Sequence, residues 1–152
     1  MLIGVISDTH GVVTEKALEA LEGSQLIIHG GDVGDPKVIK ALGQIAPVYA
    51  VRGNTDRGRW AQALPMTQVV EVGDLCFFVI HDIGMLDLEP KAAGFNAVIY
   101  GHSHVPKEEW RDGILYFNPG SAGPKRFQLP ICLGKIRIRD GSMDVEIVNL
   151  ES

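Results

Sequence analysis

The sequence contains a series of short apolar runs, and five of them end directly before an aspartate, asparagine or histidine. The runs are LIGVIS, LIIHGG, VYAVRG, CFFVI and AVIYG, followed by Asp8 with His10, Asp32, Asn54, His81, and His102 with His104. Short apolar runs between helix and turn signals predict the buried strands of an α/β fold. Because ligands of α/β sheets bind beyond the carboxyl ends of the strands, the pattern directs seven polar side chains toward one edge of the fold.

The first third of the chain alternates strand and helix signals. Strands are expected at Leu2–Ser7, Leu26–His29 and Pro47–Val51, with helices at Thr14–Glu22 and Pro36–Leu42 between them. The second helix is expected to follow Asp35 as its N-cap and to stop at Gly43. This order predicts a parallel sheet with right-handed crossovers.

The rest of the chain is mostly β in character. We expect a short helix at Leu86–Ala93 and strands at Gln68–Val72, Leu75–Ile80, Ala97–Tyr100, Glu108–Trp110, Ile114–Phe117, Ile131–Ile138 and Met143–Val148. Gly73-Asp74, Asp112-Gly113 and Asp140-Gly141 are predicted hairpin turns. Together these elements predict one α/β domain, residues 1–152, with two stacked sheets and helices outside.

Composition narrows the class of protein. With 152 residues, 45% of them hydrophobic and 22% charged, the chain is predicted to be globular and not disordered or a coiled coil. The net charge of −5 and the absence of a long basic run argue against a nucleic-acid or membrane partner. No apolar stretch approaches the ~18 residues of a membrane span. The N-terminus lacks the basic region of a secretory signal, so we expect a cytoplasmic protein by default.

The two cysteines, Cys76 and Cys132, lie inside the apolar runs LCFFVI and PICLGKI. We interpret both as buried free thiols in a reducing compartment. Neither has a CxxC partner, which argues against a thiolate zinc site.

The seven polar residues suit a particular metal chemistry. Imidazole and carboxylate ligands without thiolate are typical of Mn, Fe, Co, Ni or Zn. Seven ligands exceed one tetrahedral zinc site and suit two ions, ~3.5–4 Å apart, that share a carboxylate. Each fragment alone is a weak signal, since D-x-H is common and G-D or G-N is an ordinary turn. The ordered combination at strand ends is far more specific.

At this point the sequence resembles the calcineurin-like metallophosphoesterase superfamily, and most closely its small bacterial and archaeal phosphodiesterases. The motifs of that branch stand here as Asp8-Thr9-His10, Gly31-Asp32, Gly53-Asn54-Thr55-Asp56, His81, Gly101-His102-Ser103-His104 and Asn118-Pro119-Gly120-Ser121. The resemblance runs from Leu2 to about Arg126 and covers nearly the whole chain.

The resemblance implies a four-layer α-β-β-α sandwich with two mixed β-sheets and a catalytic site with two divalent ions. Mn is expected, with Ni, Fe, Co or Zn as alternatives. By resemblance, one ion is held by Asp8, His10 and His104, the other by Asn54, His81 and His102, and Asp32 bridges them. A bridging hydroxide then attacks phosphorus in line, so the expected activity is hydrolysis of small phosphate esters, most of all phosphodiesters.

Two positions depart from the family pattern. Many members carry a histidine at the position of Thr55, where it is thought to protonate the leaving group, and threonine is not a useful acid at neutral pH. We therefore expect better rates with good leaving groups. The branch often has H-G-H where this chain has His81-Asp82-Ile83, which places in doubt any substrate contact of the second histidine.

Further polar residues lie near the motifs. His29, inside a predicted strand, is expected to support the site or the core without binding a metal. By resemblance, Asn118 and Ser121 support the site or contact the substrate phosphate, and the alternative is an ordinary turn built on Pro119-Gly120. Asn54 is also a weak candidate for substrate binding. Four rim cations, Arg57, Arg59, Lys125 and Arg126, are either phosphate contacts or solvated charges.

Two other classes of function stay open at this stage. A eukaryotic retromer subunit shares the fold but serves as an interaction scaffold with a degraded metal site, whereas all seven ligand positions are intact here. Larger relatives are nucleases, but they carry DNA-binding segments and the extra histidine that this chain lacks. The expected partner is a small phosphate ester, with no membrane and no nucleic acid, and a homo-oligomer is left open by analogy.

Overall fold

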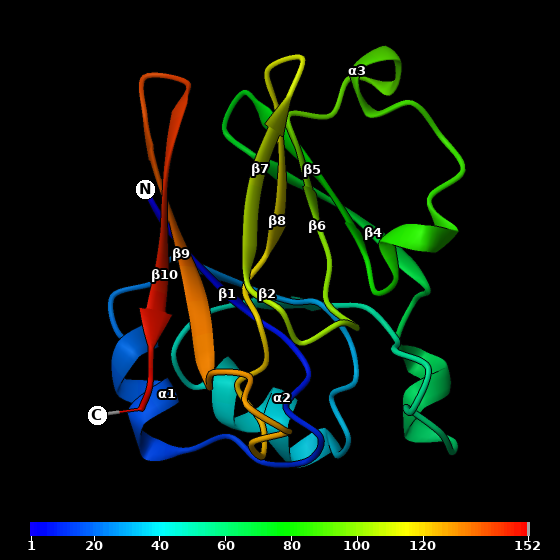
Figure 1. Cartoon of the computed structure of the whole chain (residues 1–152), viewed down its shortest axis with the longest axis vertical. Coiled ribbons are helices and arrows are strands. Elements are labelled where there is room, and N and C mark those ends of the chain that lie inside the picture. The colour runs from blue at the N-terminus through cyan, green and yellow to red at the C-terminus, as the bar shows by residue number, and fades with distance from the viewer. Residues whose placement is uncertain (152) are drawn as a thin grey trace.

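The structure is a computed structural model that describes residues 1–151, and it contains two five-stranded sheets (Figure 1). The first sheet has the order β10-β9-β1-β2-β3. Its strands are β1 (Leu2–Ile6), β2 (Leu26–His29), β3 (Val48–Ala50), β9 (Cys132–Arg139) and β10 (Ser142–Asn149). The first three strands are parallel, as predicted, and β9 pairs antiparallel to both β1 and β10.

The second sheet has the order β4-β5-β6-β8-β7. Its strands are β4 (Thr67–Val72), β5 (Leu75–Ile80), β6 (Ala97–Ile99), β7 (Lys107–Arg111) and β8 (Ile114–Asn118). The three inner strands are parallel and the two edge strands are antiparallel to their neighbours. Both sheets are therefore mixed, which confirms the expected fold class.

Two helices cover the outer face of the first sheet. They are α1 (Glu15–Leu21) and α2 (Pro36–Gly43), and they lie beneath β1 and β2 in Figure 1. Asp35 caps α2 as predicted, because its Oδ1 accepts a hydrogen bond of 2.9 Å from the N–H of Lys37. The helix ends at Gly43, one residue later than expected, and Gln44 is its C-cap.

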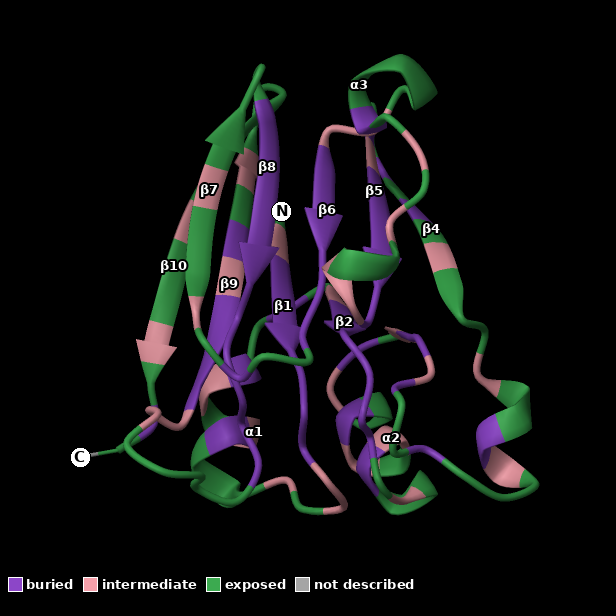
Figure 2. Cartoon of the chain, turned by 45° about the vertical axis from the view of Figure 1, so that its right-hand side comes forward, coloured by how far each residue is buried: buried purple, intermediate pink, exposed green. Residues whose placement is uncertain are grey.

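The main core lies between the two sheets. It is formed by fully buried side chains that include Ile3, Val5, Ile28 and Ile136 from the first sheet and Phe77, Val79, Ile99, Leu115 and Phe117 from the second. In Figure 2 the inner strands are buried along almost their whole length, whereas β10, β7 and β4 are largely exposed. Burial of these apolar faces against each other is the main force that stacks the sheets.

The fourth layer, on the outer face of the second sheet, is thin. It consists of a 3-10 helix, η2 (Ile83–Met85), and the four-residue α3 (Pro90–Ala93), with partly buried Leu86, Leu88 and Phe95 against the sheet. The predicted helix Leu86–Ala93 is therefore wrong in its first half. Glu89 is extended, as the residue before a proline usually is, so the helix cannot begin before Pro90. A further 3-10 helix, η1 (Trp60–Ala63), was not predicted.

The hairpin turns and the free thiols largely agree with the predictions. Asp112-Gly113 and Asp140-Gly141 each join two paired strands with positive φ at both residues, as a type I′ turn requires. Both cysteines are free, but only Cys132 is buried, and Cys76 is partly exposed.

Within residues 1–151, no helix is long and apolar enough to cross a membrane.

The two sheets approach each other closely where β9 carries Gly134. A Cβ atom at Gly134 would lie 2.4 Å from the ring of Phe117, a buried side chain of the opposite sheet. We predict that Gly134→Ala lowers the free energy of unfolding by about 1–3 kcal/mol through overpacking, measured by urea denaturation. Gly43→Ala is the matched control, because nothing lies within 4 Å of its Cβ position. Equal stability of the two variants would contradict this account of the sheet contact.

Candidate metal centre

The loops that follow five strands meet where the carboxyl ends of the two sheets come together. They follow β1, β2 and β3 in the first sheet and β5 and β6 in the second, and they carry Asp8 and His10, Asp32, Asn54, His81, and His102 and His104. Backbone hydrogen bonds join neighbouring loops. The N–H of His10 donates to the carbonyl of Asp32 over 3.0 Å, and that of Gly101 donates to His81 over 2.9 Å.

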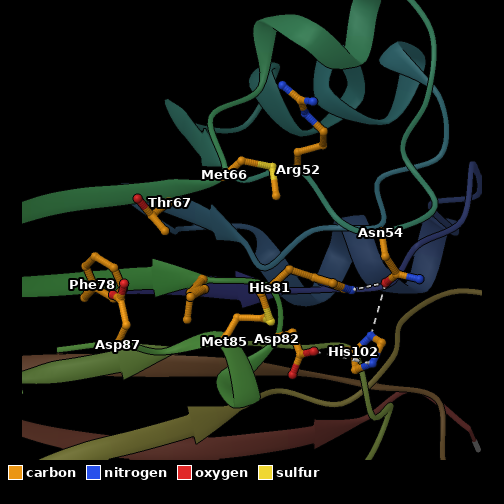
Figure 3. Close-up of a pocket in the computed structure, with 11 residues that line it drawn as sticks. Arg52, Asn54, Met66, Thr67, Phe78, His81, Asp82, Met85, Asp87 and His102 are labelled. Carbon is orange, nitrogen blue, oxygen red and sulfur yellow. Dashed lines mark hydrogen bonds and ion pairs between the residues drawn. The ribbon is translucent and has the colours of Figure 1, made fainter.

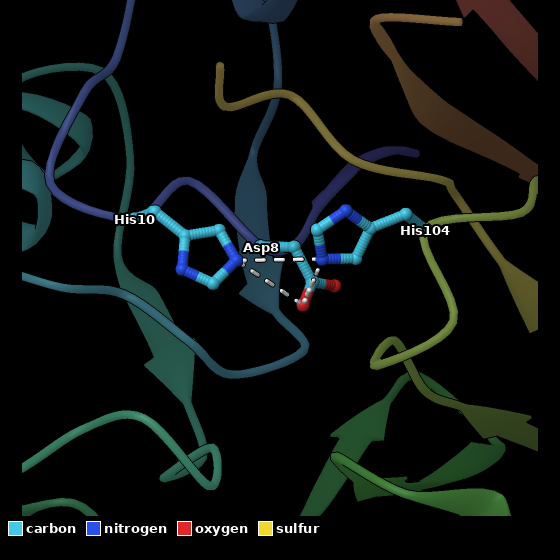
Figure 4. A group of neighbouring side chains, drawn as sticks. All are labelled: Asp8, His10 and His104. Atoms are coloured by element: carbon cyan, nitrogen blue, oxygen red, sulfur yellow. Dashed lines mark hydrogen bonds and ion pairs between the residues drawn. The ribbon is translucent and has the colours of Figure 1, made fainter. Parts of the chain in front are cut away.

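One group of donors consists of Asp8, His10 and His104, whose ligand atoms all lie within 4.8 Å of one another (Figure 4). The Nε2 atoms of the two histidines are 3.4 Å apart. Oδ1 of Asp8 lies 3.4 Å from Nε2 of His104 and 3.9 Å from Nε2 of His10. The sequence predicted this set, and the structure brings it together.

A second group contains Asp8, Asp32 and His81, and it adjoins the first. Oδ2 of Asp32 lies 3.3 Å from Nε2 of His81 and 3.8 Å from Nε2 of His10. The Asp32 carboxylate therefore stands between a histidine of each group. Oδ1 of Asp8 is also 4.0 Å from His81, so the two groups form one continuous cluster.

Asn54 extends this cluster toward the last predicted donor. Its Oδ1 atom lies 3.0 Å from Nε2 of His81 and 3.1 Å from Nδ1 of His102. Bond lengths of about 2.1 Å place neighbouring ligands of one ion about 3 Å apart. Both distances from the Asn54 oxygen match the spacing of ligands around one ion, and the contacts connect all seven residues singled out in the sequence.

The Asp8 carboxylate gives an independent test of whether a cation fits. Its Oδ2 atom accepts hydrogen bonds from the hydroxyl of Ser7 at 2.6 Å and from the N–H of His102 at 3.1 Å. Its Oδ1 atom is buried and has no hydrogen-bond partner among residues 1–151. A buried carboxylate oxygen without a partner is costly, and that oxygen faces three imidazole nitrogens. The Asp8 carboxylate and the three histidines around it therefore fit a divalent metal ion.

His81 is held in the tautomer that a metal ligand needs. Its Nδ1 atom lies 2.7 Å from the carbonyl oxygen of Gly30, which can only accept, so Nδ1 carries the proton. In the neutral ring Nε2 is then unprotonated and faces Asp32 and Asn54. Backbone carbonyls commonly orient ligating histidines in this way.

Mutual charge shifts the ionisation of the cluster. Burial disfavours the charged form of Asp32, but hydrogen bonds from His81 and from the N–H of Thr55 lower its pKa well below the usual value. Burial alone would lower the pKa of His81, yet the hydrogen bond and charge of Asp32 raise it overall. Burial also lowers the pKa of His10. Asp32 is therefore ionised across the physiological range, as a metal ligand must be.

The backbone of the cluster is unusual. Eight non-glycine residues among the described ones have positive φ, and five of them are the donors Asp8, His10, Asp32, His102 and His104, with φ between 47° and 74°. Aspartate and histidine tolerate this left-handed region better than most residues, but each such position is disfavoured. Concentration of these positions at one site indicates that the surrounding fold holds the donors in their orientations.

Two motif glycines leave room for carboxylates. A Cβ at Gly53 would lie 2.0 Å from Oδ1 of Asp32, and one at Gly101 would lie 2.5 Å from Oδ2 of Asp8. The glycine before Asn54 and the glycine before His102 therefore let the loops close around another loop's donor. This explains why G-N and G-H occur as pairs.

Asp56 organises the site, and the sequence analysis gave it no role beyond its place in the motif. Its buried carboxylate accepts hydrogen bonds from the backbone N–H groups of Val33, Gly34 and Gly53, at 2.8–3.1 Å. It thereby ties the loop after Asp32 to the loop that carries Asn54. The signal available in the sequence was the final aspartate of G-N-x-D.

Position 55 contributes through its backbone. The N–H of Thr55 donates to Oδ1 of Asp32 over 2.9 Å, which leaves Oδ2 facing the histidines. Any residue except proline can supply this hydrogen bond. The departure from the family histidine at this position therefore leaves the support of Asp32 intact.

His29 lies beneath the cluster and not in it. It is fully buried, its Nδ1 accepts from the N–H of Gly31 at 3.0 Å, and its Nε2 lies 3.0 Å from the hydroxyl of Thr9. Both ring nitrogens are thus engaged within the protein, in agreement with the expected supporting role.

Asn118 and Ser121 also engage the protein and not the open side of the cluster. The Asn118 amide donates to the carbonyl of Gly101 and to the hydroxyl of Ser103, and the Ser121 hydroxyl donates to the carbonyl of Asp8. Both side chains are buried. Support of the donor loops, one of the roles expected for these residues, fits this geometry.

The four rim cations differ in their surroundings. Arg57 and Arg59 are exposed, and Lys125 pairs with Glu151. Arg126 is exposed, lies close enough to lower the pKa of His10, and lines a small hollow together with His102 and His104. Arg126 is therefore the rim cation best placed to meet an anion at the cluster.

Comparison with known proteins bears on this site directly. The calcineurin-like phosphoesterase superfamily domain matches residues 1–141. The chain belongs to this superfamily. It is 35% identical to a probable metallophosphoesterase of Methanocaldococcus jannaschii over 99% of this chain and 82% of that protein. It is 32% identical to the phosphodiesterase YfcE of Escherichia coli K12 over 86% of this chain and 84% of that protein.

Among solved structures, the chain resembles Entamoeba histolytica Vps29 in complex with zinc, with a TM-score of 0.77 and 22% identity over 99% of this chain and 100% of that one. At this identity the likeness concerns the fold alone. Family membership, the named relatives and the cluster of aspartates and histidines support a metal-dependent phosphoester hydrolase. The superfamily expected from the sequence motifs is therefore confirmed.

Removal of the Asp56 carboxylate should loosen the site. We predict that Asp56→Ala lowers the free energy of unfolding by about 3 kcal/mol or more, because three backbone N–H groups, two of them buried, lose their acceptor. Urea denaturation of the metal-free protein measures this loss. Asp74→Ala, in the exposed turn between β4 and β5, is the control and should change stability little. Equal effects of the two substitutions would contradict the organising role.

His29 should make stability depend on pH. Burial lowers its pKa from 6.5 to about 4, so between these values the unfolded chain binds more protons than the folded one. The free energy of unfolding therefore falls as the pH is lowered from 6.5 toward 4. We predict a smaller fall between pH 7 and pH 5 for His29→Asn, measured by urea denaturation with chelator. The same pH dependence in both proteins would refute this assignment.

Proposed function

We propose that this chain is a dinuclear phosphodiesterase that hydrolyses small phosphate diesters. The observation that carries the proposal is the position of the Asp32 carboxylate, with Oδ2 between His10 of one donor group and His81 of the other. We assign Asp8, His10 and His104 to one ion, Asn54, His81 and His102 to the second, and Asp32 to both. Mn²⁺ is the proposed metal, with Ni²⁺, Fe²⁺, Co²⁺ or Zn²⁺ as alternatives.

Charge supports an anionic substrate at this centre. When bound, the two ions supply an activated water and polarise the phosphoryl oxygens. Four positive charges against two carboxylates and one hydroxide leave a net positive charge. Arg126 adds a cation at the rim, where a phosphate oxygen can accept from its guanidinium.

The reaction follows from this arrangement. The oxygen of a water adds to phosphorus, the opposite P–O bond breaks, and the products are a phosphate monoester and an alcohol. The Thr55 side chain cannot protonate the leaving oxygen near neutral pH, so that oxygen takes its proton from solvent. Rates should therefore depend steeply on the acidity of the leaving alcohol.

The scaffold alternative has less support. Its basis is the likeness of fold to Vps29, which carries no functional argument at 22% identity. A scaffold does not need an oriented His81, a carboxylate shared between two donor groups or a buried carboxylate oxygen left without a hydrogen bond. A cytoplasmic location, expected by default from the sequence, is proposed here, and the two free thiols are in keeping with it.

We predict that the purified protein hydrolyses bis(p-nitrophenyl) phosphate with Mn²⁺ or Ni²⁺. Asp32→Asn and His81→Ala should lower kcat/KM by at least about a hundredfold, since loss of a supporting contact already costs about 10–100-fold in such sites. Release of p-nitrophenolate measures the rate, and elemental analysis should find two ions per wild-type chain. Asp144→Asn, on exposed β10, is the control.

Two outcomes would contradict the proposal, one for the enzymatic activity and one for the number of ions. Metal-supplemented protein without activity on a broad panel of mono- and diesters, including cyclic nucleotides, would exclude the enzyme. One ion per chain together with full activity would exclude the dinuclear assignment.

A further inference from the structure

A pocket of about 470 Å³ opens directly beside the cluster (Figure 3). Asn54, His81 and His102, the donors assigned to the second ion, form part of its lining. Most of the rest comes from β4, β5 and η2 and from the segment that precedes β4. The volume lies in the range of about 300–1,000 Å³ typical of small-molecule sites.

The floor of this pocket is apolar and firmly held. It is formed by Phe78 and Ile80 of β5, each 8% exposed. The Phe78 ring also packs on Phe95, with ring centroids 5.1 Å apart. The floor is thus a preformed surface of aromatic and aliphatic atoms.

Two methionines form adaptable walls. Met66 and Met85 line the pocket and are 62% and 71% exposed, so the core of the protein does not account for them. Methionine is flexible and polarisable, and it makes favourable contacts with aromatic rings. Figure 3 shows Met66 and Met85 on opposite sides of the pocket, with Asn54, His81 and His102 at one end.

The charged residues of the pocket argue against an occupant that carries a negative charge of its own, in addition to the phosphate at the metal cluster. Two carboxylates, those of Asp82 and Asp87, and one guanidinium, that of Arg52, line the pocket. The guanidinium already donates to the carbonyl of Leu64 from Nε and Nη2, at 3.3 and 3.2 Å. The pocket therefore favours an organic group without a further phosphate.

The place of the pocket indicates which part of a diester it meets. In an in-line displacement the leaving oxygen departs opposite the attacking water, and the retained ester group lies to the side. The leaving oxygen must stay open to the solvent that protonates it, so the pocket, with its apolar lining beside Asn54, His81 and His102, suits the retained organic group.

We propose that this pocket binds the organic group that stays on phosphorus, and that this group is uncharged and aromatic or apolar. The inference rests on the proposed function and names its substrate class: phosphodiesters of aromatic or apolar alcohols. Water adds to phosphorus, the P–O bond to the other alcohol breaks, and the monoester product keeps the group that occupies the pocket.

Two diesters with one leaving group test the inference by kinetics. Bis(p-nitrophenyl) phosphate and methyl p-nitrophenyl phosphate both release p-nitrophenolate, but they retain an aryl and a methyl group respectively. The ratio of their kcat/KM values should fall about tenfold in Met66→Ala/Met85→Ala relative to wild type. The intrinsic reactivity of the esters cancels in this comparison. Ile147→Ala, an exposed apolar residue on β10, is the matched control and should leave the ratio unchanged.

Binding gives a readout that does not depend on turnover. The chain has four methionines, whose ¹³C-labelled methyl groups report local contacts. In Zn²⁺-loaded protein, phenylphosphonate should shift the signals of Met66 and Met85 and leave that of Met143, on β10, unchanged. Methylphosphonate should shift neither pocket methionine.

The results separate the two proposals. If wild type cleaves both diesters and the ratio is the same in the pocket variant, the pocket inference is overturned and the proposed function stands. Phenylphosphonate binding without shifts at Met66 and Met85 would overturn the inference as well. Failure of wild type to cleave either ester would overturn the proposed function.

Discussion

The arrangement of the loops depends on one constraint: histidine nitrogens are crowded around the carboxylates of Asp8 and Asp32. Oxygens of Asp8 and Asp32 lie within 4.0 Å of nitrogens from three histidines, His10, His81 and His104, and one of these oxygens has no hydrogen bond among the described residues. Such an arrangement is unfavourable without a cation. The fold maintains it through left-handed backbone conformations at five donors and through Asp56, which ties two of the loops together.

The same crowding explains the division between donors and supporting residues. Ser7, Thr55 and Gly30 each satisfy one atom of a donor and leave another atom of that donor facing the cluster. Selectivity for metal over proton then follows from orientation as much as from residue type. The region beside Asn54, His81 and His102 is built differently, from apolar side chains on β5 and two exposed methionines. On the two proposals above, the metal chemistry and the recognition of the organic group occupy adjacent parts of one site.

Much of the fold could be predicted from local signals. The strands Leu26–His29 and Leu75–Ile80 have the predicted bounds, because each is an apolar run that ends at a polar residue or turn. The segment from Leu86 to Ala93 was misjudged, since its apolar residues are spaced by packing on the second sheet and Pro90 sets the true helix start. The 3-10 helix Trp60–Ala63 has no periodic signal of its own.

The donors of the site were predictable for a simple reason: each follows a strand, so topology alone brings them together. The role of Asp56 was not, because its partners Val33 and Gly34 are more than twenty residues away and contribute only backbone N–H groups. The pocket was equally hidden, since Met66, Phe78 and Met85 belong to segments that meet only in three dimensions.

One consequence of the donor arrangement concerns the mechanics of the whole molecule. Asp8, His10, Asp32 and Asn54 come from the first sheet, whereas His81, His102 and His104 come from the second. On the proposed assignment, each ion has ligands from both sheets, so the pair of ions acts as a reversible cross-link between the two halves of the sandwich. Metal occupancy would then govern how cooperatively the two sheets unfold, and the proposed catalytic centre would also stabilise the packing of one sheet on the other.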